Sequence, residues 1–208
     1  MSPDPAPEPT DVPADVPAEL REETIASERL YEGRIVNLRR DTQRLADGSE
    51  ASREVVEHVP AVVIVAFDDR GRIAFVRQWR SPVGRPLLEL PAGVMEEGED
   101  PEFSAARELQ EEAGLRPGSL LPLPRFYVAP GWTNEYLYGF LARDCEPSRL
   151  AADDDERIIV EYHTLGEAMD MVAAAEIEDA KTIICLQAVA LRAVGPLGAK
   201  VVRFYAGE

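Results

Sequence analysis

The sequence has few residues of the kinds that build covalent cross-links or soft-metal sites. It contains two cysteines, Cys145 and Cys185, and two histidines in 208 residues. Two isolated thiols provide neither a disulfide framework nor zinc-ligand spacing. We therefore interpret both cysteines as buried or partly buried small hydrophobes in a reducing compartment. His58 and His163 lie in strand-like surroundings, and we interpret each of them as structural.

Long apolar runs and basic residues are scarce as well. No run approaches the roughly 20 apolar residues needed to cross a membrane, and the N-terminus lacks the pattern of a signal peptide. We therefore expect a cytoplasmic protein without a membrane partner. The 22 Lys and Arg against 39 Asp and Glu give a formal net charge of −17. This charge disfavours a nucleic-acid duplex as partner, whereas divalent cations could still bridge the acids to a phosphate substrate.

The first part of the chain differs in composition from the rest. Residues 1–19 hold six of the seventeen prolines, five acids and no base. Such a segment buries too little apolar surface to offset the entropy lost on ordering, so we predict a disordered tail over residues 1–20. Residues 21–58 hold strand-like runs and a strong hairpin signal at Asp47-Gly48. Because these strands are too few to stand alone, we predict a small N-terminal β subdomain that packs on the main domain or on a second subunit.

Residues 59–208 show the pattern of a sheet covered by helices. The run AVVIVAF at 61–67 is continuously apolar, which is typical of a strand buried on both faces. The run RIAFVRQW at 72–79 follows a turn and is predicted to be its partner strand. Further strand-like runs lie at 86–93, 126–143 and 156–165, and helices are predicted at about 101–113, 166–175 and 179–194. This order predicts a fold of the α/β or α+β class, with helices packed on a sheet.

The first predicted helix concentrates like charges on one face. Asp100 suits an N-cap, Pro101 suits the first helical position, and Gly114 marks the end. Glu108, Glu111 and Glu112 are three and four residues apart, so they share a face and repel each other. A hard divalent cation such as Mg²⁺ or Mn²⁺ would offset that repulsion. For the three glutamates alone, a solvated acidic face is the alternative.

The residues around this helix favour a bound cation over a solvated acidic face. The segment GVMEEGEDPEFSAARELQEEAGL, residues 93–115, fits Gly-x5-Glu-x7-Arg-Glu-U-x-Glu-Glu-x-Gly-U, where U is a bulky aliphatic residue. A chance match is on the order of one in 10⁸. The pattern is the Nudix box, and the chain resembles the Nudix hydrolases, which hydrolyse a nucleoside diphosphate linked to another group. The resemblance implies an α/β/α sandwich with a mixed sheet. It also implies metal ligands at Glu108, Glu111, Glu112 and the Ala92 carbonyl, and residues that brace the box and tune the site at Arg107 and Glu99.

Residues on either side of the box indicate which subfamily the chain resembles. The stretches RQWRSP at 77–82, ELPAG at 89–93 and PGWTNE at 130–135 are similar to the ADP-ribose pyrophosphatase subfamily, although related NDP-sugar hydrolases share parts of them. The resemblance implies that Arg53 and Arg80 hold substrate phosphate or base, a task that suits a guanidinium. It further implies that Gly131 and Glu135 lie in a loop that meets the substrate. The alternatives are surface ion pairs for the arginines and an exposed loop acid for Glu135.

The resemblance implies a Mg²⁺-dependent hydrolysis of the diphosphate of ADP-ribose to AMP and ribose 5-phosphate, with Mn²⁺ as a substitute. In this subfamily the general base comes from an acidic loop after the box, which matches ADDDER at 152–157; Glu156 is the first candidate and Asp154 the second. The subfamily is typically homodimeric, and the N-terminal strands of one subunit reach the active site of the other. Two alternatives stay open: a Nudix hydrolase of another NDP-sugar or dinucleotide, and a non-catalytic nucleotide-binding Nudix domain.

Overall fold

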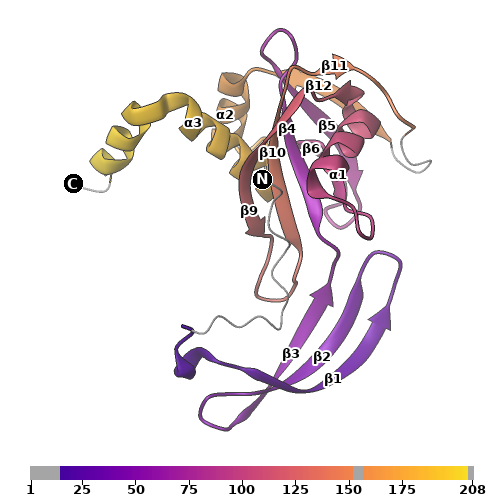
Figure 1. Cartoon of the computed structure of the whole chain (residues 1–208), viewed down its shortest axis with the longest axis vertical. Coiled ribbons are helices and arrows are strands. Elements are labelled where there is room, and N and C mark those ends of the chain that lie inside the picture. The colour runs from indigo at the N-terminus through magenta and orange to yellow at the C-terminus, as the bar shows by residue number, and fades with distance from the viewer. Residues whose placement is uncertain (1–14, 152–156, 206–208) are drawn as a thin grey trace. The chain divides into compact units, whose positions relative to one another are not determined.

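The computed structural model describes residues 15–151 and 157–205, with side chains as far as Arg192. The chain divides into two compact units (Figure 1). The first comprises Met1–Pro60 and Tyr127–Tyr136, and the second comprises Ala61–Phe126 and Leu137–Glu208. The two candidates for the general base, Asp154 and Glu156, lie outside the described residues.

The first unit is built on a three-stranded antiparallel sheet. A 3₁₀ turn, η1 (Ala18–Leu20), precedes β1 (Glu23–Glu32), β2 (Asn37–Arg44) and β3 (Glu50–Glu57), which lie in the order β1-β2-β3. The hairpin predicted at Asp47-Gly48 is confirmed, because this turn joins β2 to β3. Gly48 has a φ of 83° there, and the Asp47 carboxylate accepts a hydrogen bond from the Ser49 N–H. A left-handed φ of this kind suits glycine, which has no Cβ.

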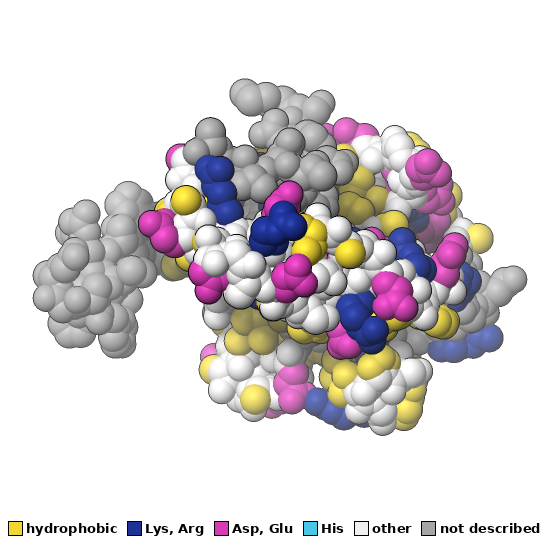
Figure 2. All heavy atoms as spheres, turned by 90° about the horizontal axis from the view of Figure 1, so that it is seen from below, with side chains coloured by type: hydrophobic (Ala, Val, Ile, Leu, Met, Phe, Trp, Pro, Cys, Tyr) yellow, Lys and Arg dark blue, Asp and Glu magenta, His cyan; other side chains and the backbone are white. Residues whose placement is uncertain are grey.

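Polar contacts rather than apolar burial hold this sheet together. Asp41 is only 2% exposed and accepts hydrogen bonds from Ser27 and Arg39. Among residues 15–60 and 127–136, no hydrophobic side chain is buried, and Tyr31, Ile35 and Trp132 are each more than half exposed. On the face drawn in Figure 2, acidic, basic and hydrophobic side chains are interspersed rather than separated into large patches. The described part of this unit therefore has no hydrophobic core of its own.

The second unit contains two larger sheets and a short ribbon. One sheet has the order β7-β4-β10-β9, with β10 parallel and β7 antiparallel to β4. The other has the order β12-β5-β6 and is antiparallel, and β11 pairs with β8. The strands are β4 (Ala61–Ala66), β5 (Ile73–Arg80), β6 (Arg85–Glu89), β7 (Ala92–Val94), β8 (Leu115–Arg116), β9 (Ser119–Tyr127), β10 (Tyr136–Arg143), β11 (Glu146–Pro147) and β12 (Ile158–His163).

The prediction that residues 72–79 pair with residues 61–67 is wrong. β4 and β5 are joined by a turn that the Asp68 carboxylate organises, but beyond a single bridge between Phe67 and Ile73 they belong to different sheets. All of β4 and the first half of β5 are buried, so each strand is covered on both faces. For β4, the contacts with β5, with the helix at Pro101–Glu108 and with the helix at Ala180–Tyr205 provide that cover.

Helices cover the mixed sheet. α1 (Pro101–Glu108) contacts β4 and β7, and α3 (Ala180–Tyr205) contacts β4 and α2 (Leu165–Ala173). Figure 1 shows α1 on one side of the β4–β10 sheet and the pair α2 and α3 on the other. The core between them includes Phe75, Leu90 and Leu186. The predicted mixed fold with helices on a sheet is thus confirmed. Within the described residues, no helix is long and apolar enough to cross a membrane.

Candidate active site

The loop and helix that follow β7 form the frame of the candidate site. The Asp100 carboxylate accepts a hydrogen bond of 2.9 Å from the Glu102 N–H, and α1 begins at Pro101, so the predicted N-terminus is confirmed. Gly114 ends the helical segment with a φ of 68°, as its predicted role as a stop requires. Both ends are therefore fixed by local chemistry.

The helix changes type where the glutamates lie. It is an α-helix only as far as Glu108 and continues as a π-helix, η2, over Leu109–Ala113, closed by a hydrogen bond from Gly114 N–H to Leu109 O. We expected a regular α-helix over this stretch. A π-turn is wider than an α-turn and is frequent at functional sites. It therefore changes the direction of the Glu111 and Glu112 side chains relative to Glu108.

Two of the three glutamates are buried against the strand that precedes the loop. Glu108 is 9% exposed and Glu112 is 3% exposed, which would be costly for carboxylates without partners. The Glu112 carboxylate accepts a hydrogen bond of 2.8 Å from the Ala92 N–H. The Glu108 carboxyl lies so close to Gly93 that a Cβ on Gly93 would overlap it. The structure thus brings Ala92, Gly93, Glu108 and Glu112 together.

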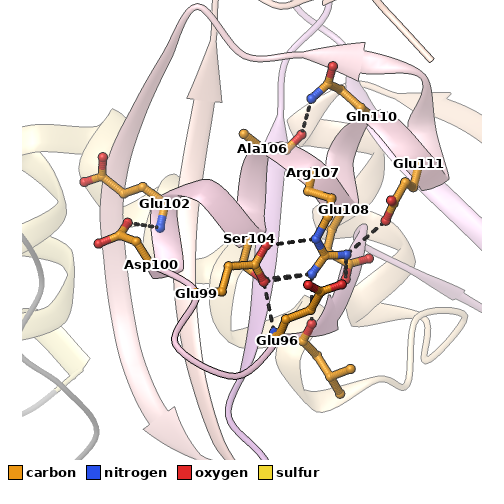
Figure 3. A network of polar contacts seen from close by, with 11 residues as sticks. Glu96, Glu99, Asp100, Glu102, Ser104, Ala106, Arg107, Glu108, Gln110 and Glu111 are labelled. Carbon is orange, nitrogen blue, oxygen red and sulfur yellow. Dashed lines mark hydrogen bonds and ion pairs between the residues drawn. The ribbon is translucent and has the colours of Figure 1, made fainter. Parts of the chain in front are cut away.

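Arg107 is the hub of the polar contacts around this segment (Figure 3). Its Nε and Nη2 donate to both carboxylate oxygens of Glu99 at 2.9 and 3.0 Å, and Nη2 also donates to the Val94 carbonyl. Its Nη1 donates to Glu108 at 2.7 Å and to Glu111 at 3.0 Å. One guanidinium therefore ties the loop to the helix and compensates two of the crowded glutamates.

The protonation states follow from these contacts. The hydrogen bonds from Arg107 lower the pKa of Glu99 from 4.5 to about 2, and the Glu96 N–H adds a further hydrogen bond to this carboxylate. The hydrogen bonds to Glu99 in turn raise the pKa of Arg107. Both groups are therefore charged throughout the physiological range, so the brace between loop and helix is an ion pair.

The donor set fits a hard divalent cation. Glu108, Glu111, Glu112 and the Ala92 carbonyl offer only oxygen atoms, which are the ligands that Mg²⁺ and Mn²⁺ prefer. Among the residues that the structure describes, no three acidic, histidine or cysteine side chains converge closely enough to hold a metal ion. Arg107 Nη1 lies between Glu108 and Glu111 and supplies the positive charge there. A cation bound by these carboxylates would compete with that nitrogen.

Arg80, at the end of β5, is held rigidly near the glutamates of the helix, and β5 contacts η2. Its Nε and Nη2 donate to the two oxygens of Glu89 at 2.7 and 2.6 Å. These hydrogen bonds raise the pKa of the Arg80 guanidinium, and the negative charge of Glu112 contributes to the same shift. The alternative for Arg80 was a surface ion pair. Because Glu89, its bidentate partner, is almost fully buried, the pair is not of that kind.

The remaining predicted substrate residues lie in the first unit. Arg53 is half exposed on β3 and donates to Glu22 at 2.7 Å, which is the arrangement of a surface ion pair. Glu135 lies 4.0 Å from the Nδ1 atom of His58, and its own N–H is bonded to the Thr133 hydroxyl. A Cβ built on Gly131 meets nothing within 4 Å, so packing does not require a glycine at this position.

Sequence reasoning missed a buried polar network next to Arg80. Glu89 accepts hydrogen bonds from Lys181 as well as from Arg80, and it is only 1% exposed. The Thr182 hydroxyl, also fully buried, accepts a hydrogen bond of 2.9 Å from the Leu90 N–H. The only sequence signal was one acid in the otherwise apolar run PLLEL, because a buried charge of this kind requires a partner.

Comparison with known proteins gives two family matches that together span most of the chain. The NUDIX domain matches residues 57–184. The nucleoside diphosphate sugar hydrolase N-terminal domain matches residues 22–56.

Individual relatives are similar over nearly the same span. An ADP-ribose pyrophosphatase of Bacillus subtilis (strain 168) is 37% identical over 175 residues, which cover 83% of this chain and 95% of the relative. An ADP-ribose pyrophosphatase of Mycobacterium tuberculosis is 42% identical over 170 residues, covering 80% and 82% respectively. The crystal structure of an ADP compounds hydrolase matches with a TM-score of 0.76 at 22% identity, over 84% of this chain and 96% of that one, so the fold is shared.

Proposed function

This chain belongs to the Nudix family, and on that premise we propose that it is an ADP-ribose pyrophosphatase dependent on Mg²⁺, which Mn²⁺ can replace. The proposed reaction is the hydrolysis of the diphosphate of ADP-ribose to AMP and ribose 5-phosphate. Two relatives named ADP-ribose pyrophosphatase, at 37% and 42% identity over most of their lengths, support this substrate. The nearly buried glutamates packed against Ala92 and Gly93 are the observation that carries the proposed chemistry.

Each proposed role rests on a position in the second unit. Glu108, Glu111, Glu112 and the Ala92 carbonyl would hold the cation, which supplies charge neutralisation for the diphosphate. Arg107 keeps the loop and the helix in register through Glu99. Arg80 is held at the edge of the same group and would orient a substrate phosphate, because Glu89 engages only one side of its guanidinium.

Further residues complete the proposal from sequence resemblance. Arg53, Gly131 and Glu135 would contact the base, the phosphate or the ribose of the substrate. A carboxylate after the box, Glu156 in the first place and Asp154 in the second, would take the proton from the attacking water. The water oxygen bonds to one phosphorus as the bond from that phosphorus to the bridging oxygen breaks, and the bridging oxygen leaves with the other phosphate. Replacement of Glu156 by Gln, with Asp154→Asn alongside, assigns the base: the variant that loses activity most strongly at neutral pH identifies it.

A second candidate function is the hydrolysis of another nucleoside diphosphate sugar. It is favoured by the match of residues 22–56 to a domain described as that of nucleoside diphosphate sugar hydrolases in general. Its chemistry at Glu108, Glu111 and Glu112 would be the same. The two candidates differ in the groups that contact the base and the sugar, so a substrate panel separates them.

The test is product analysis with a panel of substrates. Purified protein is incubated with ADP-ribose, GDP-mannose, NADH or a diadenosine polyphosphate, with Mg²⁺ and with EDTA. The proposal predicts AMP and ribose 5-phosphate from ADP-ribose as the fastest reaction, abolished by EDTA. Faster turnover of GDP-mannose would move the chain to the second candidate. An absence of turnover with every compound would favour a nucleotide-binding domain without catalysis.

We also propose that the protein is a cytoplasmic homodimer, with residues 21–58 as its N-terminal β subdomain, residues 59–208 as the hydrolase domain and residues 1–20 as a tail. The support is that no hydrophobic side chain is buried among residues 15–60 and 127–136. Exposed side chains such as Tyr31 and Ile35 would be covered by a second copy. Light scattering should give twice the chain mass of 22.9 kDa, and a monomer mass at micromolar concentration would refute the dimer.

A further inference from the structure

The first turn of α3 is connected to the strand that leads into the candidate site. Asp179 caps this helix, since its carboxylate accepts hydrogen bonds of 2.9 and 2.6 Å from the N–H and hydroxyl of Thr182. The same hydroxyl accepts the Leu90 N–H. Lys181 donates to Glu89 and, at 3.0 Å, to Asp179. The turn therefore holds both the side chain of residue 89 and the backbone of residue 90, just before the Ala92–Glu112 contact.

Glu89 stands between two cations and cannot turn to water. It is 1% exposed, and its Oε2 atom accepts hydrogen bonds from both Arg80 Nη2 and Lys181 Nζ. Burial alone would raise the pKa of this carboxyl, but the hydrogen bonds from Arg80 and the charge of Lys181 hold it below its usual value. A carboxylate fixed by three donors has a defined orientation. Because Arg80 binds both of its oxygens, the orientation of the Arg80 guanidinium is fixed as well.

One edge of the Arg80 guanidinium stays available. Nε and Nη2 are engaged by Glu89, whereas Nη1 makes no hydrogen bond to any described residue. No buried side-chain nitrogen or oxygen lacks a partner in the part of the chain that the structure describes, so Nη1 reaches solvent. The Arg80 side chain is 36% exposed, in agreement with this. Two N–H donors on a rigidly held nitrogen suit a phosphate oxygen.

We propose that Lys181 is a positioning residue for substrate binding, which acts through Glu89 to hold the Arg80 guanidinium with its Nη1 edge toward a substrate phosphate. This inference rests on the proposed function, in which Arg80 binds the diphosphate. Lys181 itself makes no contact with substrate in this account. Lys181 compensates part of the negative charge of Glu89, which Arg80 would otherwise neutralise alone. It also fixes the orientation of the Glu89 carboxylate.

Charge sharing explains why a lysine on a distant helix matters. Glu89 paired with Arg80 alone would cancel the charge that Arg80 offers to a phosphate. With Lys181 as a second cation on the same oxygen, part of the Arg80 charge remains uncompensated. Asp179 accepts a hydrogen bond from Lys181 and also caps the N-terminus of α3, so its negative charge is shared between the lysine and the helix. Loss of Lys181 should therefore weaken substrate binding without removing any group that contacts the substrate.

The experiment is a double-mutant cycle between Lys181 and Arg80 in the full-length protein. The variants are Lys181→Met, Arg80→Met and the double variant, and KM, kcat and the Mg²⁺ concentration for half activation are measured with ADP-ribose. Arg85→Met is the matched control, because Arg85 also joins β6 to the segment before α3 through an ion pair with Glu178, but both side chains are about half exposed. Lys181→Arg tests rescue by a side chain that keeps the charge and the donors.

The expected result is specific to a positioning role. Lys181→Met should raise KM about tenfold, the size of one lost charge-assisted contact, and change kcat and the Mg²⁺ requirement little. Lys181→Arg should restore KM to within about threefold of wild type. In the Arg80→Met background the Lys181→Met change should have no further effect on KM. Arg85→Met should match wild type throughout.

Other outcomes overturn the inference. A normal KM in Lys181→Met, or KM effects that multiply in the double variant, would show that Lys181 does not act through Arg80. If Lys181→Met does not fold, Lys181→Gln keeps a hydrogen-bond donor for Glu89 but removes the charge. It should fold and show a raised KM, and a normal KM would refute the inference. Turnover by the wild-type protein tests the proposed function separately: if no substrate of the panel is hydrolysed, the proposed function and this inference fail together.

Discussion

Replacement of Gly93 by Ala is the most direct perturbation of the candidate site. A Cβ at this position would overlap the Glu108 carboxyl, with its carbon and both oxygens all inside van der Waals distance. Ordinary contact between carbon atoms lies near 3.5–4.0 Å, so the carboxyl must retreat by about 1 Å or more. Glu108 is 9% exposed and bonded to Arg107, so it has little room in which to do so.

The magnitude follows from that displacement. A misplacement of about 1 Å at a reacting centre costs on the order of 10²-fold in rate, and overpacking costs about 1–3 kcal/mol of folding free energy. Gly93→Ala should therefore lower kcat/KM by about 10²-fold and raise the Mg²⁺ concentration for half activation, while the protein still folds. Both are measured by AMP release at several Mg²⁺ concentrations, and stability is measured by urea unfolding.

Gly166→Ala is the control for this prediction. Gly166 lies near the start of α2, and a Cβ there meets nothing within 4 Å, so activity should be unchanged and stability slightly increased. The reasoning about Glu108 is refuted if Gly93→Ala retains kcat/KM within twofold of wild type, at an unchanged Mg²⁺ requirement.

Three further predictions concern stability. The pKa of Glu99 is lowered from 4.5 to about 2, so its ion pair stabilises the fold fully above pH 4.5 and is lost as the pH falls toward 2. The difference in melting temperature between wild type and Glu99→Gln should therefore close over that range, and a constant difference would contradict the assignment. Asp100→Ala removes the α1 cap and should cost about 1 kcal/mol in urea unfolding, whereas Asp100→Asn should cost less. Thr182→Val leaves the buried Leu90 N–H without its acceptor and should cost about 1–3 kcal/mol, with Thr182→Ser close to wild type.

Local chemistry made much of the fold predictable. The Asp47-Gly48 hairpin, the Asp100 cap and the Gly114 stop each depend on residues within a few positions of each other, and the structure confirms all three. The box segment is also continuous in sequence, so the contacts among Glu99, Arg107 and Glu108 lie within one short segment. Such features follow from backbone and capping preferences that do not depend on the rest of the fold.

Features that depend on distant pairing could not be predicted. The sequence of β4 and β5 predicts a hairpin, yet the two strands belong to different sheets. β4 pairs with β10 and β5 pairs with β12, and both of these partners lie much later in the chain. Glu89 ends strand β6, and its partner Lys181 lies 92 residues further along the chain, in α3. The π-turn at Leu109–Ala113 also has no signature in the periodicity, since the same residues fit a regular α-helix.

The central claim is that Glu108, Glu111 and Glu112 form a metal-dependent hydrolytic site for ADP-ribose. Its most direct test is the rate of AMP formation from ADP-ribose by Glu112→Gln, across a range of Mg²⁺ concentrations and with EDTA. Glu97→Gln is the control, because Glu97 is an exposed acid in the same loop. The account predicts a rate lower by orders of magnitude and a raised Mg²⁺ requirement in Glu112→Gln only. An unchanged rate and Mg²⁺ dependence in Glu112→Gln, or full wild-type activity in EDTA, would contradict it.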